Sequence, residues 1–325
     1  DAGSPEVDPE RLGIDWATGI GGVWTLLDAY DTLRERGPRR VLPMTVPMLM
    51  PNGPAAAIGM DLGARGGIRT VVSACASSTE SIVNAGEHVQ FGCADVIIAG
   101  GSGAAINPLP IASFASMQAL SRRNDDPATA SRPYDVTRDG FVLGEGAAAL
   151  VLETYEHAIA RGARIYAEVL GGAVTSDAFH ITAPDPEGSA ASRAMRQAVE
   201  RSGHSLTDVV HVNAHATSTP VGDIAEYNAL RRVFGDHLDD IVVAATKAST
   251  GHLLGGAGAI EALFTVKALY ERVVPPTINL TQQDPEIPLD VATSPRALPA
   301  GDLLAISNSF GFGGHNAVAA FASVS

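Results

Sequence analysis

The chain has 325 residues, of which 46% are hydrophobic and 18% are charged, so it can bury a substantial core and is not a disordered chain. Its formal charge of −14 comes without a long basic run, which excludes a groove that follows a nucleic-acid backbone. Only Cys75 and Cys93 are present. This excludes a disulfide framework and indicates a reducing, cytoplasmic compartment.

The beginning of the sequence is acidic and contains proline, unlike the basic and then apolar order of a signal peptide. No apolar run approaches the roughly 20 residues of a spanning helix. We therefore expect neither a secretory leader nor a membrane segment.

Short β-branched runs that end in Gly or Ser and precede segments of helical length predict an α/β fold. In chain order these runs are residues 68–73, 95–100, 209–212 and 241–245. The first and last look alike, because each continues into a short turn and a helix opening rich in Ser, Thr and Ala. We interpret this likeness as a weak internal duplication.

No linker of low complexity separates the two parts of the chain. The prediction is therefore two closely packed halves, residues 1–163 and 164–325, with a seam near residues 161–164.

Cys75 directly follows an apolar strand and precedes a predicted helix over residues 76–92. A cysteine at a helix N-terminus faces the positive end of the macrodipole and unpaired N–H groups, which lower its pKa from about 8.5 toward neutrality. This position predicts a nucleophile, with a buried inert thiol as the alternative. Cys93 opens the next strand and is assigned a structural role.

His215 and His252 each lie at the end of a short strand, where loops project side chains into sites. Where two similar halves meet, these imidazoles and Cys75 can converge. The other histidines are assigned structural roles, with His180 the least certain of them. No close His or Cys pair supports a metal site, and the glycines of residues 255–258 lack the spacing of a dinucleotide fingerprint.

Four segments occur in a fixed order. They are residues 73–78 (Ser-Ala-Cys-Ala-Ser-Ser), 213–220 (Asn-Ala-His-Ala-Thr-Ser-Thr-Pro), 246–255 (Thr-Lys-Ala-Ser-Thr-Gly-His-Leu-Leu-Gly) and 308–316 (Asn-Ser-Phe-Gly-Phe-Gly-Gly-His-Asn). Together they resemble the motifs of the elongating, type II β-ketoacyl-acyl carrier protein synthases, and the resemblance covers nearly the whole chain. It implies the thiolase fold, a layered α/β structure of two pseudo-symmetric halves.

The resemblance also implies an activity, the decarboxylative addition of malonyl units to a growing fatty-acyl chain. Cys75 would accept the acyl group through an oxyanion held by the backbone N–H groups of Cys75 and Phe312. His215 and His252 would hydrogen-bond the malonyl thioester oxygen. No cofactor is implied beyond the 4′-phosphopantetheine of acyl carrier protein. The supporting pair of the family is matched by Lys247 and Glu261.

Further residues match positions along the substrate path of relatives. Thr217 and Thr219 match positions that hydrogen-bond the pantetheine arm. Ile20 and Phe312 would gate an acyl tunnel with Thr45 near its far end, where relatives often have larger phenylalanines. Since threonine fills less volume, long acyl chains are expected to fit. The remaining substrate-binding matches are Phe114, Thr182 and Phe310.

The implied partner is acyl carrier protein, whose docking on an acidic chain needs a local basic patch. The candidates are Arg39, Arg40, Arg122 and Arg123, which could also be ordinary solvated arginines. Relatives dimerise through the strand after the nucleophile helix, which implies a homodimer through residues 94–100.

The sequence departs from the family pattern in two places. Ala216 stands where many relatives have glycine after the first histidine. Relatives also carry a strand and a helix upstream of residues 12–22, and we expect this N-terminal strand and helix to be absent here.

Other members of the fold are discriminated by single residues. A thiolase would need a second cysteine within residues 308–316, and an initiating synthase would have Asn in place of His252. A type II polyketide ketosynthase remains an alternative. A non-catalytic chain-length factor is the other, although it would lack the nucleophile Cys75.

Overall fold

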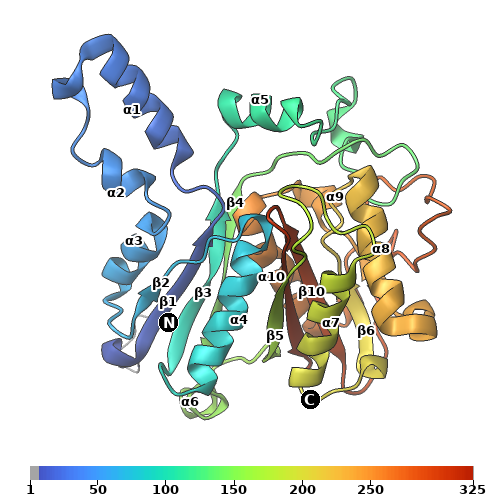
Figure 1. Ribbon diagram of the computed structural model, residues 1–325. Helices are drawn as coiled ribbons and strands as arrows, with labels where there is room; N and C mark the ends of the chain where they lie inside the picture. Colours follow the sequence, from blue (N-terminus) through green and yellow to red (C-terminus); the bar gives the residue numbers. More distant parts are fainter. Residues whose placement is uncertain (1–6, 325) are drawn as a thin grey trace.

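The structure is a computed structural model that describes residues 7–324. Two β-sheets alternate with helices in five layers (Figure 1). Helix α3 (Gly53–Leu62) covers one sheet, α4 (Ser77–Gln90) and α10 (Ala257–Glu271) lie between the sheets, and α7 (Ser189–Arg201) and α8 (Pro220–Phe234) cover the other. The middle layer packs its apolar residues against both sheets.

The first sheet has the order β2-β1-β3-β4, in which β4 alone is antiparallel to its neighbour. These strands are β1 (Leu12–Thr18), β2 (Ile68–Arg69), β3 (Val96–Gly103) and β4 (Gly146–Glu153). The second predicted run, residues 95–100, is thus confirmed as β3. The first, residues 68–73, forms only the two-residue strand β2.

The second sheet has the order β5-β11-β10-β6-β7. Its strands are β5 (Glu168–Ser176), β6 (Val209–Asn213), β7 (Val242–Ala244), β10 (Leu304–Gly311) and β11 (His315–Ala322). The order β7-β6-β10-β11 repeats the order β2-β1-β3-β4 of the first sheet, and the last strand is antiparallel in both. The strand order confirms the internal duplication that the two similar turns indicated.

The chain passes from the first sheet to the second between β4 and β5. The predicted boundary between residues 163 and 164 falls in this interval and stays a prediction. The other elements are α1 (Val23–Arg36), α2 (Thr45–Leu49), α5 (Pro108–Ser116), α6 (Tyr155–Ala160), α9 (Lys247–Thr250), β8 (Val273–Val274) and β9 (Arg296–Ala297).

Small residues let the two central helices approach each other closely. A Cβ added at Gly258 of α10 would lie 2.0 Å from Oγ1 of Thr79 in α4. The N–H of Ala259 donates to Oγ of Ser78 over 2.8 Å. Because the contact joins the first turns of both helices, it also brings together the chain turns that precede them.

The prediction that residues 94–100 form a dimer edge is wrong. Strand β3 pairs with β1 along residues 96–102 and with β4 along residues 96–103. Both of its edges are therefore used inside the chain, and its apolar character reflects burial on both faces. The edges of this sheet are β2 and β4.

Candidate active site

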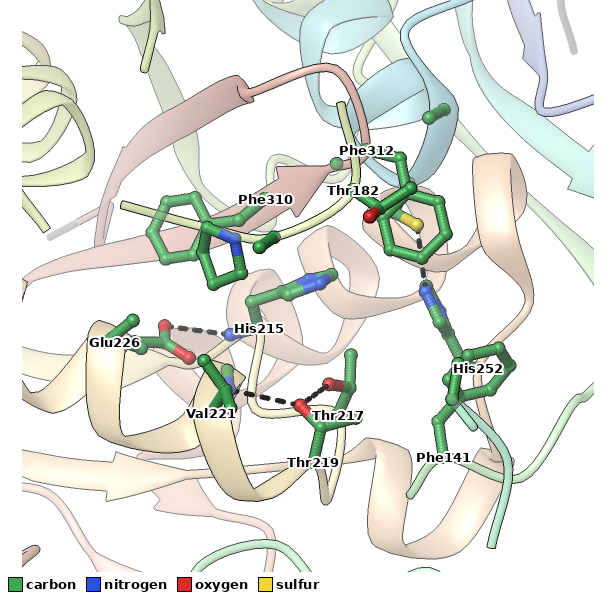
Figure 2. Close-up of a pocket in the computed structure, with 18 of the residues that line it drawn as sticks. Phe141, Thr182, His215, Thr217, Thr219, Val221, Glu226, His252, Phe310 and Phe312 are labelled. Atoms are coloured by element: carbon green, nitrogen blue, oxygen red, sulfur yellow. Dashed lines mark hydrogen bonds between the residues drawn. The ribbon is translucent and has the colours of Figure 1, made fainter. Parts of the chain in front are cut away.

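A cavity of about 690 Å³ opens where the two halves meet and takes its walls from both (Figure 2). Cys75 comes from the first half, while His215 and His252 come from the second. The structure thus brings the three predicted catalytic residues into one site.

A strained turn places Cys75 at the start of α4. The preceding residue, Ala74, has φ +52°, a left-handed conformation that costs a non-glycine residue free energy. The hydroxyl of Ser77 holds this turn, because it donates to the Ala74 carbonyl over 2.6 Å and accepts from the Ser73 N–H over 2.9 Å. A short 3₁₀ turn (Ala74–Ala76) then leads into the helix, so the predicted helix over residues 76–92 is observed as Ser77–Gln90.

The thiol of Cys75 lies 3.0 Å from Nε2 of His252. Burial raises the pKa of this thiol to about 11, although the charge of Lys247 and the backbone N–H of Phe312 lower it. The predicted lowering of the Cys75 pKa is therefore wrong, because loss of water outweighs the helix terminus. A thiol with this pKa is protonated at neutral pH, and His252 is the base within reach of its proton.

Backbone hydrogen bonds pin both histidines to neighbouring segments. The N–H of His215, which follows β6, donates to Oε1 of Glu226 over 2.9 Å. The N–H of His252 donates to the Val142 carbonyl over 2.7 Å, and its own carbonyl accepts from the Gly144 N–H over 2.9 Å. The two imidazole rings lie 5.5 Å apart at 85°, which leaves space for one atom to contact both.

Both imidazoles are held neutral. Burial lowers the pKa of His252 well below its ordinary value, and the positive charge of Lys247 lowers it further. The same two causes, together with His252, lower the pKa of His215. The ring of Phe141 packs edge-on against His252 with centroids 5.3 Å apart, which helps to keep water away. A neutral imidazole can donate one hydrogen bond, so the pair can stabilise an oxyanion.

Lys247 and Glu261 form a buried ion pair, with each side chain 1% exposed. The ammonium group bonds Glu261 and not an imidazole, so it acts on the histidines through its charge. Burial raises the pKa of Glu261 to about 7, although Lys247 lowers it. The predicted supporting pair is present, while direct orientation of the rings by it is not observed.

The turn that contains Phe312 packs directly on the nucleophile turn. A Cβ added at Gly311 would lie 2.8 Å from the Ser73 carbonyl and 3.0 Å from the Cys75 nitrogen, so no larger residue fits there. This close approach brings the Phe312 N–H to the thiol. The N–H groups of Cys75 and Phe312 are thus placed where an oxyanion would form.

Most of the predicted substrate-binding residues line the same cavity. The hydroxyls of Thr217 and Thr219 lie 3.0 Å apart, and Thr219 also accepts from the Gly222 N–H as the N-cap of α8. The binding role and the capping role of Thr219 are therefore compatible. The other lining residues predicted from sequence are Ile20, Phe114, Thr182, Phe310 and Phe312.

Thr45 lies elsewhere. It belongs to α2 and lines a separate hollow of about 150 Å³ between α1 and α2. The structure does not join this hollow to the cavity that contains Cys75. The tunnel end at Thr45 stays a prediction.

Sequence reasoning missed Glu226, a carboxyl group 2% exposed in α8. It accepts the backbone N–H groups of His215 and Ala216 and the side-chain amide of Asn308, over 2.9, 2.7 and 3.0 Å. Burial raises its pKa, although these bonds lower it. A glutamate beside Ala225, on the apolar face of a helix, was the signal that could have identified it.

Within residues 7–324 no group of His, Cys, Asp and Glu has the arrangement of a metal site. None of the helices in that range is both long and apolar enough to cross a bilayer.

Comparison with known proteins gives a consistent assignment. The profile of the beta-ketoacyl synthase N-terminal domain matches residues 1–158, and that of the C-terminal domain matches residues 166–281. A 3-oxoacyl-[acyl-carrier-protein] synthase 2 from Mycobacterium tuberculosis is 50% identical over 322 residues, which cover 98% of this chain and 76% of the relative. The synthase 2 of a Synechocystis species is 49% identical, with 97% and 76% covered.

Two similar solved structures are also ketosynthases or ketoacyl synthases. A ketosynthase of a type II polyketide synthase, bound to a hexaketide and in complex with its acyl carrier protein, has a TM-score of 0.94 at 32% identity, covering 99% of this chain and 80% of that one. A beta-ketoacyl synthase from Burkholderia phymatum has a TM-score of 0.89 at 38% identity, covering 97% and 76%.

Fold and comparisons together define a thiolase-fold condensing enzyme, an acyltransferase, and its cavity contains a buried cysteine and two imidazoles. Within that class, the chain belongs to the beta-ketoacyl synthase family.

Proposed function

We propose that this chain elongates acyl chains by decarboxylative condensation of malonyl-acyl carrier protein with an acyl-enzyme thioester. The observation that carries the proposal is one buried site in which a thiol lies 3.0 Å from a neutral imidazole, with the ring centroid of a second neutral imidazole 5.5 Å from that of the first. The names of the synthase 2 relatives support the same reaction.

In the first half-reaction, the thiol of Cys75 attacks the thioester carbonyl of the acyl donor. His252 takes the thiol proton, and the N–H groups of Cys75 and Phe312 hold the oxyanion. The carrier thiolate leaves with that proton, so the acyl group is transferred without net proton uptake. The raised pKa of Cys75 makes this proton transfer necessary.

In the second half-reaction, the malonyl group loses carbon dioxide, and the electron pair of the broken bond forms an enolate. Neutral His215 and His252 donate hydrogen bonds to the enolate oxygen. The enolate carbon attacks the acyl carbonyl, the oxyanion collapses and the Cys75 thiolate leaves. Because its pKa is about 11, that thiolate takes up one proton from solvent and restores the resting thiol.

We propose acyl carrier protein as the partner that delivers both substrates. A solved ketosynthase similar to this chain is in complex with one. The N–H of Arg122 donates to Asp139, which lines the cavity wall, while Arg123 donates to Thr137; Arg39 and Arg40 are exposed. Charge reversal at Arg122 and Arg39 should raise KM for a carrier-borne substrate and leave kcat unchanged. An unchanged KM would show that these arginines do not contribute to docking of the carrier protein.

We also propose a homodimer, formed through the free edge of β2 rather than through β3. Ile68 on this edge and Val72, three residues beyond the end of β2, are 43% and 51% exposed. The neighbouring α1 and α2, which project from the body in Figure 1, expose Trp24 and Met48. An apolar edge of this kind is safest when paired. Light scattering at micromolar concentration tests it, and a monomer would contradict it.

The cysteine usage leads us to propose a cytoplasmic location.

Intact mass after incubation with acyl carrier protein thioesters tests the reaction. The expected result is an acyl adduct on Cys75 that malonyl-acyl carrier protein converts into a product two carbons longer. Absence of the adduct would overturn the proposal. A product extended several times would favour the polyketide alternative, which the similarity to the hexaketide-bound ketosynthase supports.

A further inference from the structure

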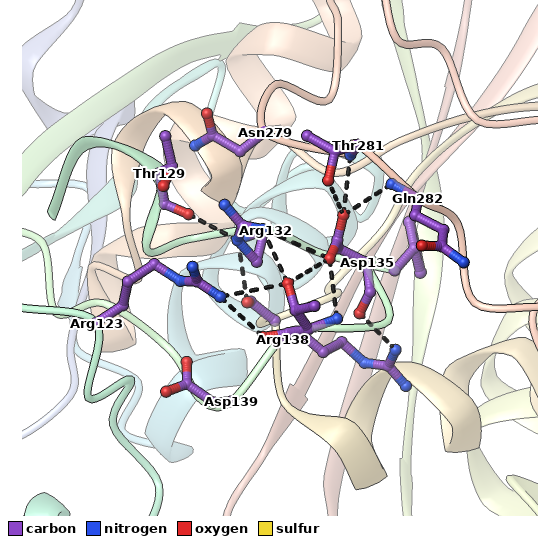
Figure 3. Close-up of polar contacts among 12 residues, drawn as sticks. Arg123, Thr129, Arg132, Asp135, Arg138, Asp139, Asn279, Thr281 and Gln282 are labelled. Atoms are coloured by element: carbon purple, nitrogen blue, oxygen red, sulfur yellow. Dashed lines mark hydrogen bonds and ion pairs between the residues drawn. The ribbon is translucent and has the colours of Figure 1, made fainter. Parts of the chain in front are cut away.

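A loop of the first half crosses onto the second half beside the cavity, around the buried carboxylate of Asp135 (Figure 3). Oδ1 accepts the N–H and the hydroxyl of Thr137 over 2.9 and 2.6 Å. Oδ2 accepts the N–H and hydroxyl of Thr281 over 2.9 and 2.8 Å, and the N–H of Gln282 over 3.0 Å. Burial by itself raises the pKa of Asp135, but these bonds outweigh it and lower the pKa. The carboxylate fixes the loop to the second half.

The neighbouring Arg138 reaches from this loop to the first turn of α8. Its guanidinium, 3% exposed, donates to the carbonyls of Thr219 and Pro220 over 3.4 and 3.2 Å. It also donates to Asp284 over 2.8 Å and lies 3.4 Å from Asp223. A cation is unfavourable at a helix N-terminus, so these two carboxylates are needed to hold it there.

The same loop holds the residues just before α8. The N–H of Gly140 donates to the Ser218 carbonyl over 3.0 Å, and the N–H of Arg132 donates to Oγ of Ser218 over 3.0 Å. Ser218 has φ +67°, so its conformation is imposed by its neighbours. Residues on both sides of it, Thr217 and Thr219, carry the paired hydroxyls in the cavity wall.

We propose that Arg138 is a positioning residue that holds the Thr217 and Thr219 hydroxyls in place for the amide groups of the substrate's pantetheine arm. The inference rests on the proposed function, since it assumes a thioester arm in this cavity. Arg138 reaches the cavity wall, but its side chain is only 3% exposed and its guanidinium donates to the carbonyls of Thr219 and Pro220 and to Asp284. It therefore acts through the threonines, and small displacements of such groups weaken substrate positioning.

The test compares Arg138→Gln with the parent on three malonyl donors: the carrier-protein thioester, the pantetheine thioester and an ethyl thioester without amides. We expect KM to rise on the order of 10-fold for the first two, with kcat within about 3-fold and no change for the ethyl thioester. Arg138→Lys should recover only part of the loss, because an ammonium cannot span two carbonyls and two carboxylates. Arg201→Gln is the matched control. Arg201 is the last residue of α7, and its guanidinium also donates to a backbone carbonyl, that of Gly172.

A double-mutant cycle with Thr219→Val separates positioning from general stability. If Arg138 acts through the hydroxyl, the KM effect of Arg138→Gln should shrink in the Thr219→Val background. Equal losses with all three donors, or additive effects in the cycle, would overturn the inference, even if melting temperatures fall. Failure of the parent to make 3-ketoacyl product from any donor would instead overturn the proposed function.

Discussion

The two halves build the same backbone turn and use it differently. In the first half, Ala74 at φ +52° begins the 3₁₀ turn that opens α4. In the second, Leu254 at φ +51° begins the 3₁₀ turn that opens α10. The residue that follows is Cys75 in one half and Gly255 in the other. A Cβ at Gly255 would lie 2.2 Å from the nitrogen of Gly19, so this turn can carry no side chain.

This difference shows how a duplicated scaffold becomes asymmetric. One turn places the Cys75 thiol in the cavity, while its counterpart at Gly255 packs against Gly19 of the first half. The second half contributes its chemistry from turns that follow β6 and the α9 helix instead, through His215 and His252.

The largest effect is expected at the nucleophile turn. Cys75→Ala should abolish condensation, by a factor of about 10³ or more, because no thioester can form. Malonyl decarboxylation should survive, since it needs the imidazoles of the other half. Product analysis and carbon dioxide release measure the two activities, with Cys93→Ala as control. Condensation at the parent rate would contradict the assignment.

A substitution in the counterpart turn should lower the stability of the fold rather than block the reaction. Gly255→Ala forces a methyl group against the backbone of Gly19, and we expect a loss of about 3 kcal/mol or more. Denaturant unfolding measures it. The matched control is Gly86→Ala in α4, where an added Cβ meets only Val169 at 3.6 Å and helix propensity should add about 0.5–1 kcal/mol. Equal stability of both variants would show that Gly255 is not constrained.

The halves should also respond to pH in opposite directions. Burial of His211 in β6 lowers its pKa from 6.5 to about 4, so the unfolded chain binds the proton more tightly. The contribution of neutral His211 to the free energy of unfolding is fully present above pH 6.5. It is lost as the pH falls toward 4, by up to about 3 kcal/mol. His211→Gln should flatten this loss in urea unfolding at several pH values. His204→Gln, at a half-buried position outside the core, should leave it unchanged.

Asp15 in β1 is the opposite case in the first half. Burial raises its pKa, although Ser81 and His88 lower it. The protonated form is favoured in the fold, so this contribution to stability is present at low pH and is lost as the pH rises. Asp15→Asn should stabilise the protein at neutral pH relative to the parent. A parallel pH profile for the two proteins would contradict this.

The smallest effect concerns the acyl path at Ile20, in the first half. Ile20→Phe should fill part of the cavity and shift acylation of Cys75 toward short chains, at a cost of about 1–2 kcal/mol for long ones. Malonyl decarboxylation should stay nearly intact, because the histidines lie in the other half. Acylation measured over a series of chain lengths decides it, and an unchanged profile would remove Ile20 from the path.

The class of fold could be read from the sequence, and the motifs predicted that Cys75, His215 and His252 form one catalytic group. Cys75, His215 and His252 each stand at the end of a short apolar run, and such strand-to-turn patterns are local, so they can be read along the chain. The likeness of residues 70–80 and 242–252 likewise indicated the duplication before the strand order was known.

Tertiary structure decided what depends on neighbours distant in sequence. Strand β3 reads like an exposed edge, yet β1 and β4 occupy both of its sides. The helix terminus at Cys75 predicts a lowered thiol pKa, yet burial by segments from the other half raises it to about 11. Pairing and desolvation are sums over contacts that no local pattern encodes, and for that reason only the folded chain could decide them.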